Sequence, residues 1–249
     1  MPVLVKAAGL IKLSQRGQRR KSLNPEKQIR EEGFAIIPGV FGNERIIDLI
    51  DELNACNPPR TRAGARHAMR LPVVANLAHD PRLTGIAQET LGSQAFPFRA
   101  TLFDKSPMAN WLVVWHQDTA LPLRDRHETP GWGPWSVKEG VIYAHAPQSA
   151  LSQILALRVH LDDSTAENGP LRVLPRTHTL GVLTDDELHK LSIRIAAVDC
   201  LIPSGGVLAM RPLIVHASSK SRSDAIRRVL HVEYASPETN FDGLELALA

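Results

Sequence analysis

A histidine and an aspartate stand two residues apart in the stretch VVWHQDTA, directly after an apolar run that is rich in β-branched residues. Alternate residues of a strand point to the same face, so the side chains of His116 and Asp118 can reach one point in space together. An imidazole and a carboxylate suit iron, manganese or zinc, and two histidines with one carboxylate suit non-haem iron(II). The pair therefore indicates a metal site, and a hydrogen-bonded strand end is the alternative interpretation.

A complete site of this kind needs a second histidine from another part of the chain. His216 is the best placed of the ten histidines, because it ends the apolar run LIVHA much as His116 ends LVVWH, and the polar loop SSKSRSD follows it. A single buried histidine is more often a hydrogen-bonded core residue than a ligand. The assignment of His216 therefore depends on the rest of the sequence.

The first part of the chain is predicted to be mainly helical. A short helix is expected to start at Asn24 and Pro25 and to end at Gly33. The stretch NERIIDLIDELNAC places its apolar residues on one helical face, and a third helix is expected from Asp80 to near Gly92.

The remainder of the chain is predicted to consist of short strands. Apolar runs recur there with turn signals between them: FPFRATLF, WLVVW, VIYAHA, QILALRVHL, LRVL, GVLAM, LIVHA and RRVLHVEY. A single helix interrupts them, opened by a capping box of Thr184 and Glu187. Because no regular helical crossovers occur, we expect a mainly β, antiparallel jelly roll flanked by N-terminal helices.

The overall composition is that of an ordinary globular protein. The chain has 249 residues with 43% hydrophobic and 22% charged residues, and its net charge of +3 is too small to argue for nucleic-acid binding. Two cysteines, Cys56 and Cys200, exclude a disulfide scaffold and fit a reducing compartment. No apolar run is long enough to cross a bilayer. We therefore expect a cytoplasmic protein with no nucleic-acid or membrane partner.

The N-terminal segment differs from the rest because it is basic and carries no acidic residue before Glu26. A targeting peptide is one interpretation, but its apolar part is short and interrupted by lysines. We expect residues 1–24 to form a basic extension and residues 25–249 to form a single jelly-roll domain.

Four motifs occur in a fixed order along the chain: REEGFAIIPGVF, WHQD, ENGPLRVLPRTH and MRPLIVHASS followed by IRRVLHVEYA. Together they resemble the phytanoyl-CoA dioxygenase family of iron(II)/2-oxoglutarate oxygenases, over residues 27–236. The resemblance implies a double-stranded β-helix of the cupin-like, jelly-roll type. It also implies an enzyme that uses iron(II), 2-oxoglutarate and O2, releases succinate and CO2, and oxidises a small molecule.

The resemblance implies that His116, Asp118 and His216 are the iron ligands. Relatives that halogenate have a small residue in place of the aspartate, so that chloride can bind the iron. The presence of Asp118 therefore favours a hydroxylase that attacks an unactivated C–H bond.

The resemblance also implies a binding site for the cosubstrate. Arg227 has the family's usual offset for the arginine that pairs with the distal carboxylate of 2-oxoglutarate, and a guanidinium can bind a carboxylate in a bidentate manner. If Leu230 and its alternate neighbours face a packed layer, Arg228 shares that side and Arg227 faces the opposite one. Ser218 matches a hydroxyl used on the same carboxylate, and Thr101 falls on a strand position that lines the cosubstrate.

Two positions depart from the family pattern. Arg158 stands where better-known members have an aromatic residue beside the cosubstrate, so it could contact 2-oxoglutarate or hold an acid group of the substrate. His160 shares the strand face of Arg158, and the two either line the pocket or form a solvent-facing pair. Arg176 replaces a common glycine and is expected to alter only a turn.

The residues expected near the substrate lie in two loops. The loop PPRTRAGARHAMR contains Arg62 and Arg66, which either form a solvated surface or attract an anionic substrate to the mouth of the jelly roll. Trp132 and Trp135 lie in a segment with glycine and proline and form either a lid or part of the core. The basic residues favour a small acidic substrate, and a CoA thioester is the alternative.

Two other functions fit part of the sequence. A cupin-like metalloenzyme could use the same metal ligands without 2-oxoglutarate, but it would not need Arg227. A non-catalytic module could retain the pocket for binding a metal or ligand. The sequence gives no indication of the oligomeric state.

Overall fold

The computed structural model describes residues 24–58, 61, 64–239 and 241–249. Of the expected basic extension, only Asn24 belongs to the described residues. Arg62 also lies outside them. No helix in the described part of the chain is long and apolar enough to cross a membrane.

The helices of the first part form as their end signals predict. The Asn24 side chain accepts a hydrogen bond from the Glu26 N–H at 3.0 Å, and the following helix ends at Gly33, whose φ of 86° favours glycine. Asp80 caps a later helix in the same way. The elements are α1 (Pro25–Glu32), α2 (Asn43–Cys56), the 3-10 helix η1 (Ala68–Arg70), α3 (Pro72–Ala78) and α4 (Pro81–Leu91).

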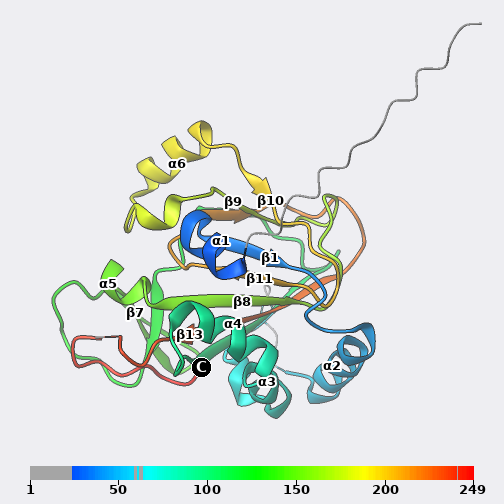
Figure 1. The fold of residues 1–249 in the computed structure, drawn as a ribbon, viewed down its shortest axis with the longest axis horizontal. Coiled ribbons are helices and arrows are strands. Elements are labelled where there is room, and N and C mark those ends of the chain that lie inside the picture. Colours follow the sequence, from blue (N-terminus) through cyan, green and yellow to red (C-terminus); the bar gives the residue numbers. More distant parts are fainter. Residues whose placement is uncertain (1–23, 59–60, 62–63, 240) are drawn as a thin grey trace, which may run out of the picture.

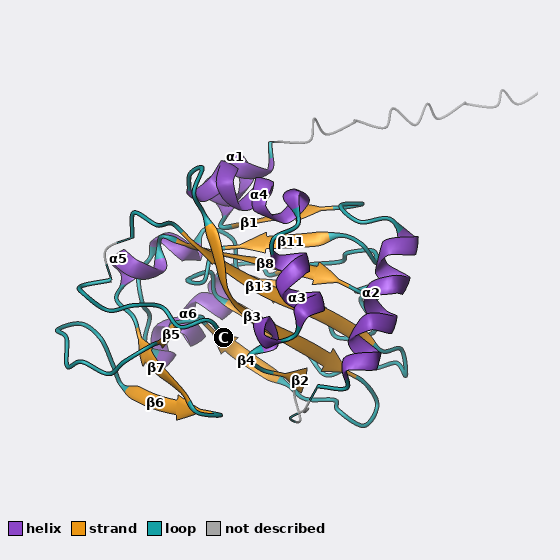
Figure 2. Cartoon of the chain, turned by 90° about the horizontal axis from the view of Figure 1, so that it is seen from below, coloured by secondary structure: helices purple, strands orange, loops and turns teal. Residues whose placement is uncertain are grey.

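A six-stranded sheet of antiparallel pairs carries these helices on its outer face (Figures 1 and 2). In spatial order its strands are β1 (Phe34–Ile37), β11 (Val207–Met210), β8 (Ile154–His160), β13 (Arg227–Ala235), β3 (Phe96–Lys105) and β2 (Gly64–Ala65). Leu157, Leu230 and Tyr234 of the outer face pack in one cluster with Leu49 and Leu77 of the helices. This cluster is the main hydrophobic core.

Two smaller sheets complete the β structure. One has the order β10 (Val198–Asp199), β9 (Leu171–Val173), β12 (His216–Ser218) and β4 (Val113–His116). The other has the order β5 (Ala120–Leu123), β7 (Val141–His145) and β6 (Trp135–Lys138). Further helical segments are α5 (Gln148–Leu151), η2 (Thr177–Thr179) and α6 (Asp185–Arg194). The predicted capping box opens α6, and the mainly antiparallel architecture with a helical cover is confirmed.

Three local predictions were wrong. The run LIVHA is not a strand throughout, because the chain turns after Pro212 and β12 begins only at His216. Asp118 is not on a strand either, since β4 ends at His116. Trp135 belongs to strand β6 rather than to a loop.

Candidate metal centre

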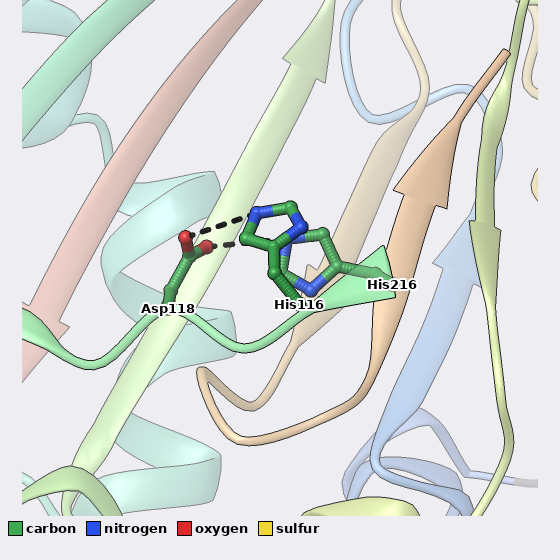
Figure 3. A group of neighbouring side chains, drawn as sticks. All are labelled: His116, Asp118 and His216. Carbon is green, nitrogen blue, oxygen red and sulfur yellow. Dashed lines mark ion pairs between the residues drawn. The ribbon is translucent and has the colours of Figure 1, made fainter. Parts of the chain in front are cut away.

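The predicted ligands converge at the junction of β4 and β12. His116 ends β4 and His216 begins β12, and the two residues are antiparallel partners in register. Nε2 of His116 lies 3.7 Å from Oδ1 of Asp118, and Nε2 of His216 lies 3.4 Å from Oδ2. One ligand atom from each residue falls within 4.8 Å of the others, and Figure 3 shows the three side chains turned toward one another.

Hydrogen bonds leave the two imidazoles ready to bind a metal. Nδ1 of His116 lies 2.9 Å from the carbonyl oxygen of Val114, and Nδ1 of His216 lies 2.8 Å from that of Ile214. A carbonyl only accepts hydrogen bonds, so Nδ1 carries the proton and the Nε2 lone pair faces Asp118. Two neutral imidazoles and a carboxylate are a donor set that fits iron(II).

Gln117 fixes the segment between the first two ligands, and sequence analysis missed it. Its side-chain amide donates to the carbonyls of Gly181 at 2.9 Å and Leu213 at 2.7 Å, and its Oε1 accepts from Leu183 N–H at 2.8 Å. These bonds use all but one of the hydrogen-bonding positions of the amide. Gln117 therefore points away from the metal while holding its neighbours in place.

The electrostatics favour the ligand forms of the side chains. Burial lowers the pKa of His216 to about 4, although the Asp118 charge acts in the opposite direction. Burial by itself would raise the pKa of Asp118, but favourable electrostatic interactions with His216, His116, His231 and Arg99 outweigh it and hold that pKa well below its usual range. At neutral pH, a neutral His216 and an ionised Asp118 are therefore available to a cation.

A cavity of about 90 Å³ adjoins the ligands. Its lining residues come from strands β3, β4, β8, β9, β12 and β13 and from the segments on either side of β4: Phe103, Trp111, Val113, His116, Asp118, Arg158, Leu171, His216, Ser218 and Arg227. Arg227 is 4% exposed, and its Nη2 lies 3.5 Å from Oγ of Ser218. Burial, followed by the Arg158 charge, lowers its pKa to about 10, so it stays charged at neutral pH. No carboxylate of the described residues forms an ion pair with Arg227, so the cavity offers an unpaired cation.

Lys105 is a second cation beside the cavity that sequence analysis missed. Its Nζ donates to Oγ of Ser218 at 2.9 Å and to the Ser219 carbonyl at 2.6 Å. Burial and the charge of Arg227 lower its pKa to about 8. Lys105 lies close to Arg227 because the two residues are antiparallel partners in the pairing of β3 with β13. The alternation from Thr101 to Lys105 on one strand was the signal that could have identified it.

Arg158 and His160 are both buried, so the interpretation as a solvent-facing pair was wrong. Arg158 lines the cavity, donates from Nη1 to Nδ1 of His231 at 2.9 Å, and lies 5.0 Å over the ring of Phe103. His160 is 1% exposed, and neither ring nitrogen has a hydrogen-bond partner among the described residues. Burial, with the nearby charges of Arg158 and Arg227, lowers the pKa of His160 to about 3, so it is neutral.

Comparison with known proteins agrees with this site. Residues 29–229 match the family described as Phytanoyl-CoA dioxygenase (PhyH). The chain belongs to this family. The resemblance inferred from the four motifs is therefore confirmed.

The chain is also similar to an individual hydroxylase. The chain is 27% identical over 188 residues to an L-proline trans-4-hydroxylase from Streptomyces griseoviridis, which covers 65% of the chain and 62% of the hydroxylase. The chain thus spans less than two thirds of that relative's length.

Two solved structures share the fold at lower identity. The non-haem α-ketoglutarate-dependent carbocyclase SnoK from nogalamycin biosynthesis has a TM-score of 0.65 at 16% identity, covering 92% of this chain and 88% of SnoK. HygX from Streptomyces hygroscopicus with iron bound has a TM-score of 0.60 at 19% identity, covering 85% of this chain and 86% of HygX. These likenesses establish the fold alone and confirm the predicted fold class.

Of the other residues predicted from the family pattern, some line the cavity and others do not. Arg227 faces inward as the alternation predicted, whereas Arg228 pairs with Asp162 at 2.8 Å on the other side. Thr101 is buried beside His231 in register but does not line the cavity. Arg176 occupies a left-handed turn at φ 68°, as its replacement of a glycine implies.

The two tryptophans belong to the core rather than to a lid. Trp132 is buried in an apolar cluster with Leu121, and its Nε1 donates to Asp242 at 3.0 Å. Trp135 packs against the same cluster. Arg66 is exposed and forms an ion pair with Glu139 at 3.2 Å. None of these side chains lines the cavity beside the metal ligands.

Proposed function

We propose that this chain is an iron(II)- and 2-oxoglutarate-dependent dioxygenase that hydroxylates an unactivated C–H bond of a small acidic molecule. The observation that carries this proposal is the combination of a two-histidine, one-carboxylate site with an adjoining cavity that contains an unpaired arginine. Family membership and the proline hydroxylase relative support it. An isolated metal-binding module would not require the buried arginine.

The metal would be held by Nε2 of His116, Nε2 of His216 and the carboxylate of Asp118. When bound, iron(II) with 2-oxoglutarate and O2 supplies the oxidation, with release of succinate and CO2. The carboxylate of Asp118 occupies a position that a halogenase would leave to chloride, which favours hydroxylation. Arg227 and Ser218 would bind the distal carboxylate of the cosubstrate.

Arg158 of the cavity lining and the residues packed around the cavity would position the cosubstrate and exclude water. Lys105 and Arg158 add positive charge next to Arg227 and have no carboxylate partner among the described residues. Thr101 and His160 lie on the same inner face and would form part of the wall behind the cosubstrate. An anion that enters the cavity would relieve the mutual repulsion of these cations.

The cations that line or adjoin the cavity, Arg158, Arg227 and Lys105, support an acidic substrate. Arg66 does not add to them, because it forms an ion pair with Glu139 at the surface, and Arg62 lies outside the described residues. We further propose a cytoplasmic location and a single domain over residues 25–249, with residues 1–24 outside it. The two free cysteines are compatible with a reducing compartment.

Anaerobic absorbance spectroscopy tests the proposed function. Addition of iron(II) and 2-oxoglutarate should give a weak visible charge-transfer band, because a 2-oxo acid that chelates iron(II) absorbs there. His216→Ala should abolish the band by removing a ligand. A protein that binds iron normally but gives no band would instead favour the cupin-like metalloenzyme that does not use 2-oxoglutarate.

A further inference from the structure

A second group of cations faces Asp118 from outside the cosubstrate cavity. Arg99 of β3 and Lys138 of β6 both interact electrostatically with Asp118. Neither residue lines the cavity that contains Arg227. The side chains of Asp118 and His116 are each 35% exposed, so the metal site is accessible from the surface. Arg99 donates from Nη1 to the carbonyl of Ala120, two residues after Asp118, so this group of cations lies beside the metal ligands.

The two cations share one aromatic ring. The guanidinium carbon of Arg99 lies 5.4 Å from the ring centroid of Tyr143, and Nζ of Lys138 lies 4.8 Å from it. The ammonium group of Lys138 forms no hydrogen bond or ion pair with another described residue. Arg99 uses Nη1 for the Ala120 carbonyl at 3.0 Å, and its buried Nε has no partner among the described residues. The ammonium group of Lys138 and Nη2 of Arg99, which has no hydrogen-bond partner among the described residues, thus remain as donors that an anion could use.

The surrounding backbone holds this group in place. His67 and Glu139 adopt left-handed conformations with φ of 53° and 50°, which cost energy for residues other than glycine. His67 makes a 3.1 Å hydrogen bond through Nε2 to the hydroxyl of Tyr143, and Glu139 pairs with Arg66. The loop after β2 is thereby tied to the β6–β7 hairpin, and the tie fixes the ring over which both cations lie.

The charges in this group match a single negative charge. Glu233 lies 3.0 Å from Nη1 of Arg99 and is buried behind it, so it offsets one of the two positive charges. Glu139 and Arg66 neutralise each other nearby. Asp118, the second acid that faces these cations, would be committed to the metal. One positive charge then remains for the substrate, which suits one carboxylate better than the several phosphate charges of a CoA thioester.

We propose that Arg99 and Lys138 bind the carboxylate of the primary substrate over the ring of Tyr143, and that the substrate is a free monocarboxylic acid. This inference rests on the proposed function, because it places the rest of the substrate next to the metal ligands. Arg99 would donate from the nitrogens that Glu233 does not occupy, and Lys138 would supply a second charged donor. This pair accounts for the acidic substrate more directly than Arg158, which faces the cosubstrate cavity.

A binding experiment on the assembled complex tests the inference. The protein is loaded anaerobically with iron(II) and saturating 2-oxoglutarate, and the charge-transfer band is followed as probes are added. The probes are L-proline, L-pipecolate and isobutyrate, the primary amide of each acid, and acetyl-CoA. We expect at least one acid to perturb the band at millimolar concentration while its amide and acetyl-CoA do not. Calorimetry of the same complex gives an independent dissociation constant.

Variants then assign the binding to this group. Lys138→Gln should weaken binding of the responsive acid about tenfold and leave the affinity for 2-oxoglutarate unchanged. Lys190→Gln, on the exposed face of α6, is the matched control and should have no effect. Arg99→Gln should weaken binding further, but it removes the arginine that pairs with the buried Glu233 and leaves that carboxylate only His231 at 3.6 Å. Lys138→Gln is therefore the decisive variant if Arg99→Gln does not fold.

Several outcomes would overturn the inference. They are equal responses to acids and amides, a response to acetyl-CoA alone, unchanged binding in Lys138→Gln, and no response to any acid. If the charge-transfer band forms in the absence of probes, the proposed function stands and only this inference fails. If the band never forms, the proposed function fails first and the inference fails with it.

Discussion

The two faces of the six-stranded sheet use the same strands for different purposes. On β8, Leu155, Leu157 and Val159 face the helices and belong to the main core. Arg158 and His160 alternate with them and face the metal site without any carboxylate partner among the described residues. The outer face therefore contributes to stability, whereas the inner face keeps charged and polar groups in a buried position that is costly without a ligand.

Truncation of the outer face should have the largest effect on stability. Leu157 is fully buried, so Leu157→Ala should lower the free energy of unfolding by roughly 2–5 kcal/mol, through lost burial and a new cavity. Urea denaturation measures this change. Because Leu157 points away from the cavity, the folded variant should bind 2-oxoglutarate with wild-type affinity. A parallel loss of 2-oxoglutarate affinity would show that the two faces are not independent.

Removal of charge from the inner face should weaken 2-oxoglutarate binding without lowering the free energy of unfolding. Arg227→Met should weaken 2-oxoglutarate binding by about a hundredfold, or about 3 kcal/mol, because the distal carboxylate loses its buried partner. Without 2-oxoglutarate, the free energy of unfolding should stay the same or rise, since a desolvated and unpaired cation is replaced by an apolar side chain. Calorimetry with the manganese(II)-loaded protein and urea denaturation measure the two effects.

The neighbouring arginine provides the matched control. Arg228 pairs with Asp162 on the other side of β13, so Arg228→Met should leave 2-oxoglutarate binding unchanged. It should cost at most about 1 kcal/mol of unfolding free energy, as is typical of a partly exposed ion pair. If Arg228→Met weakened 2-oxoglutarate binding as much as Arg227→Met, the assignment of the inner face would be wrong.

The same alternation explains how much of the site could be predicted. Arg227 could be assigned to the inner face because strand parity is a local property of the sequence. Parity placed Arg158 and His160 on one face together but left open whether that face met the pocket or solvent. The same parity places Lys105 and Arg99 on the face of Thr101, but their roles could not be predicted from it. These roles depend on the pairing of β3 with β13, and no local pattern specifies this register.

Predictions that depended on neighbouring residues were correct, whereas predictions that depended on the packing of a whole segment were wrong. The helix ends at Asn24 and Thr184 were predictable because their caps involve residues two or three positions away. Trp132 and Trp135 were not, since glycine and proline around an aromatic residue fit both an exposed loop and a packed hairpin. The apolar run before His216 likewise fitted a strand, although it turns after Pro212.

The smallest expected effect is a pH dependence set by Lys105. Its folded pKa of about 8 lies below the ordinary value of 10.5, so the unfolded chain binds more protons between these values. The free energy of unfolding should therefore receive a contribution that increases as pH rises from about 8 toward 10.5, and Lys105→Met should remove it. Affinity for 2-oxoglutarate should change in the opposite direction, because the anion loses a cationic partner as Lys105 deprotonates. Calorimetry with manganese(II) at pH values on either side of 8 would show a decline in the wild type and a flatter profile in Lys105→Met. A decline of equal size in both proteins would assign the titration to another group.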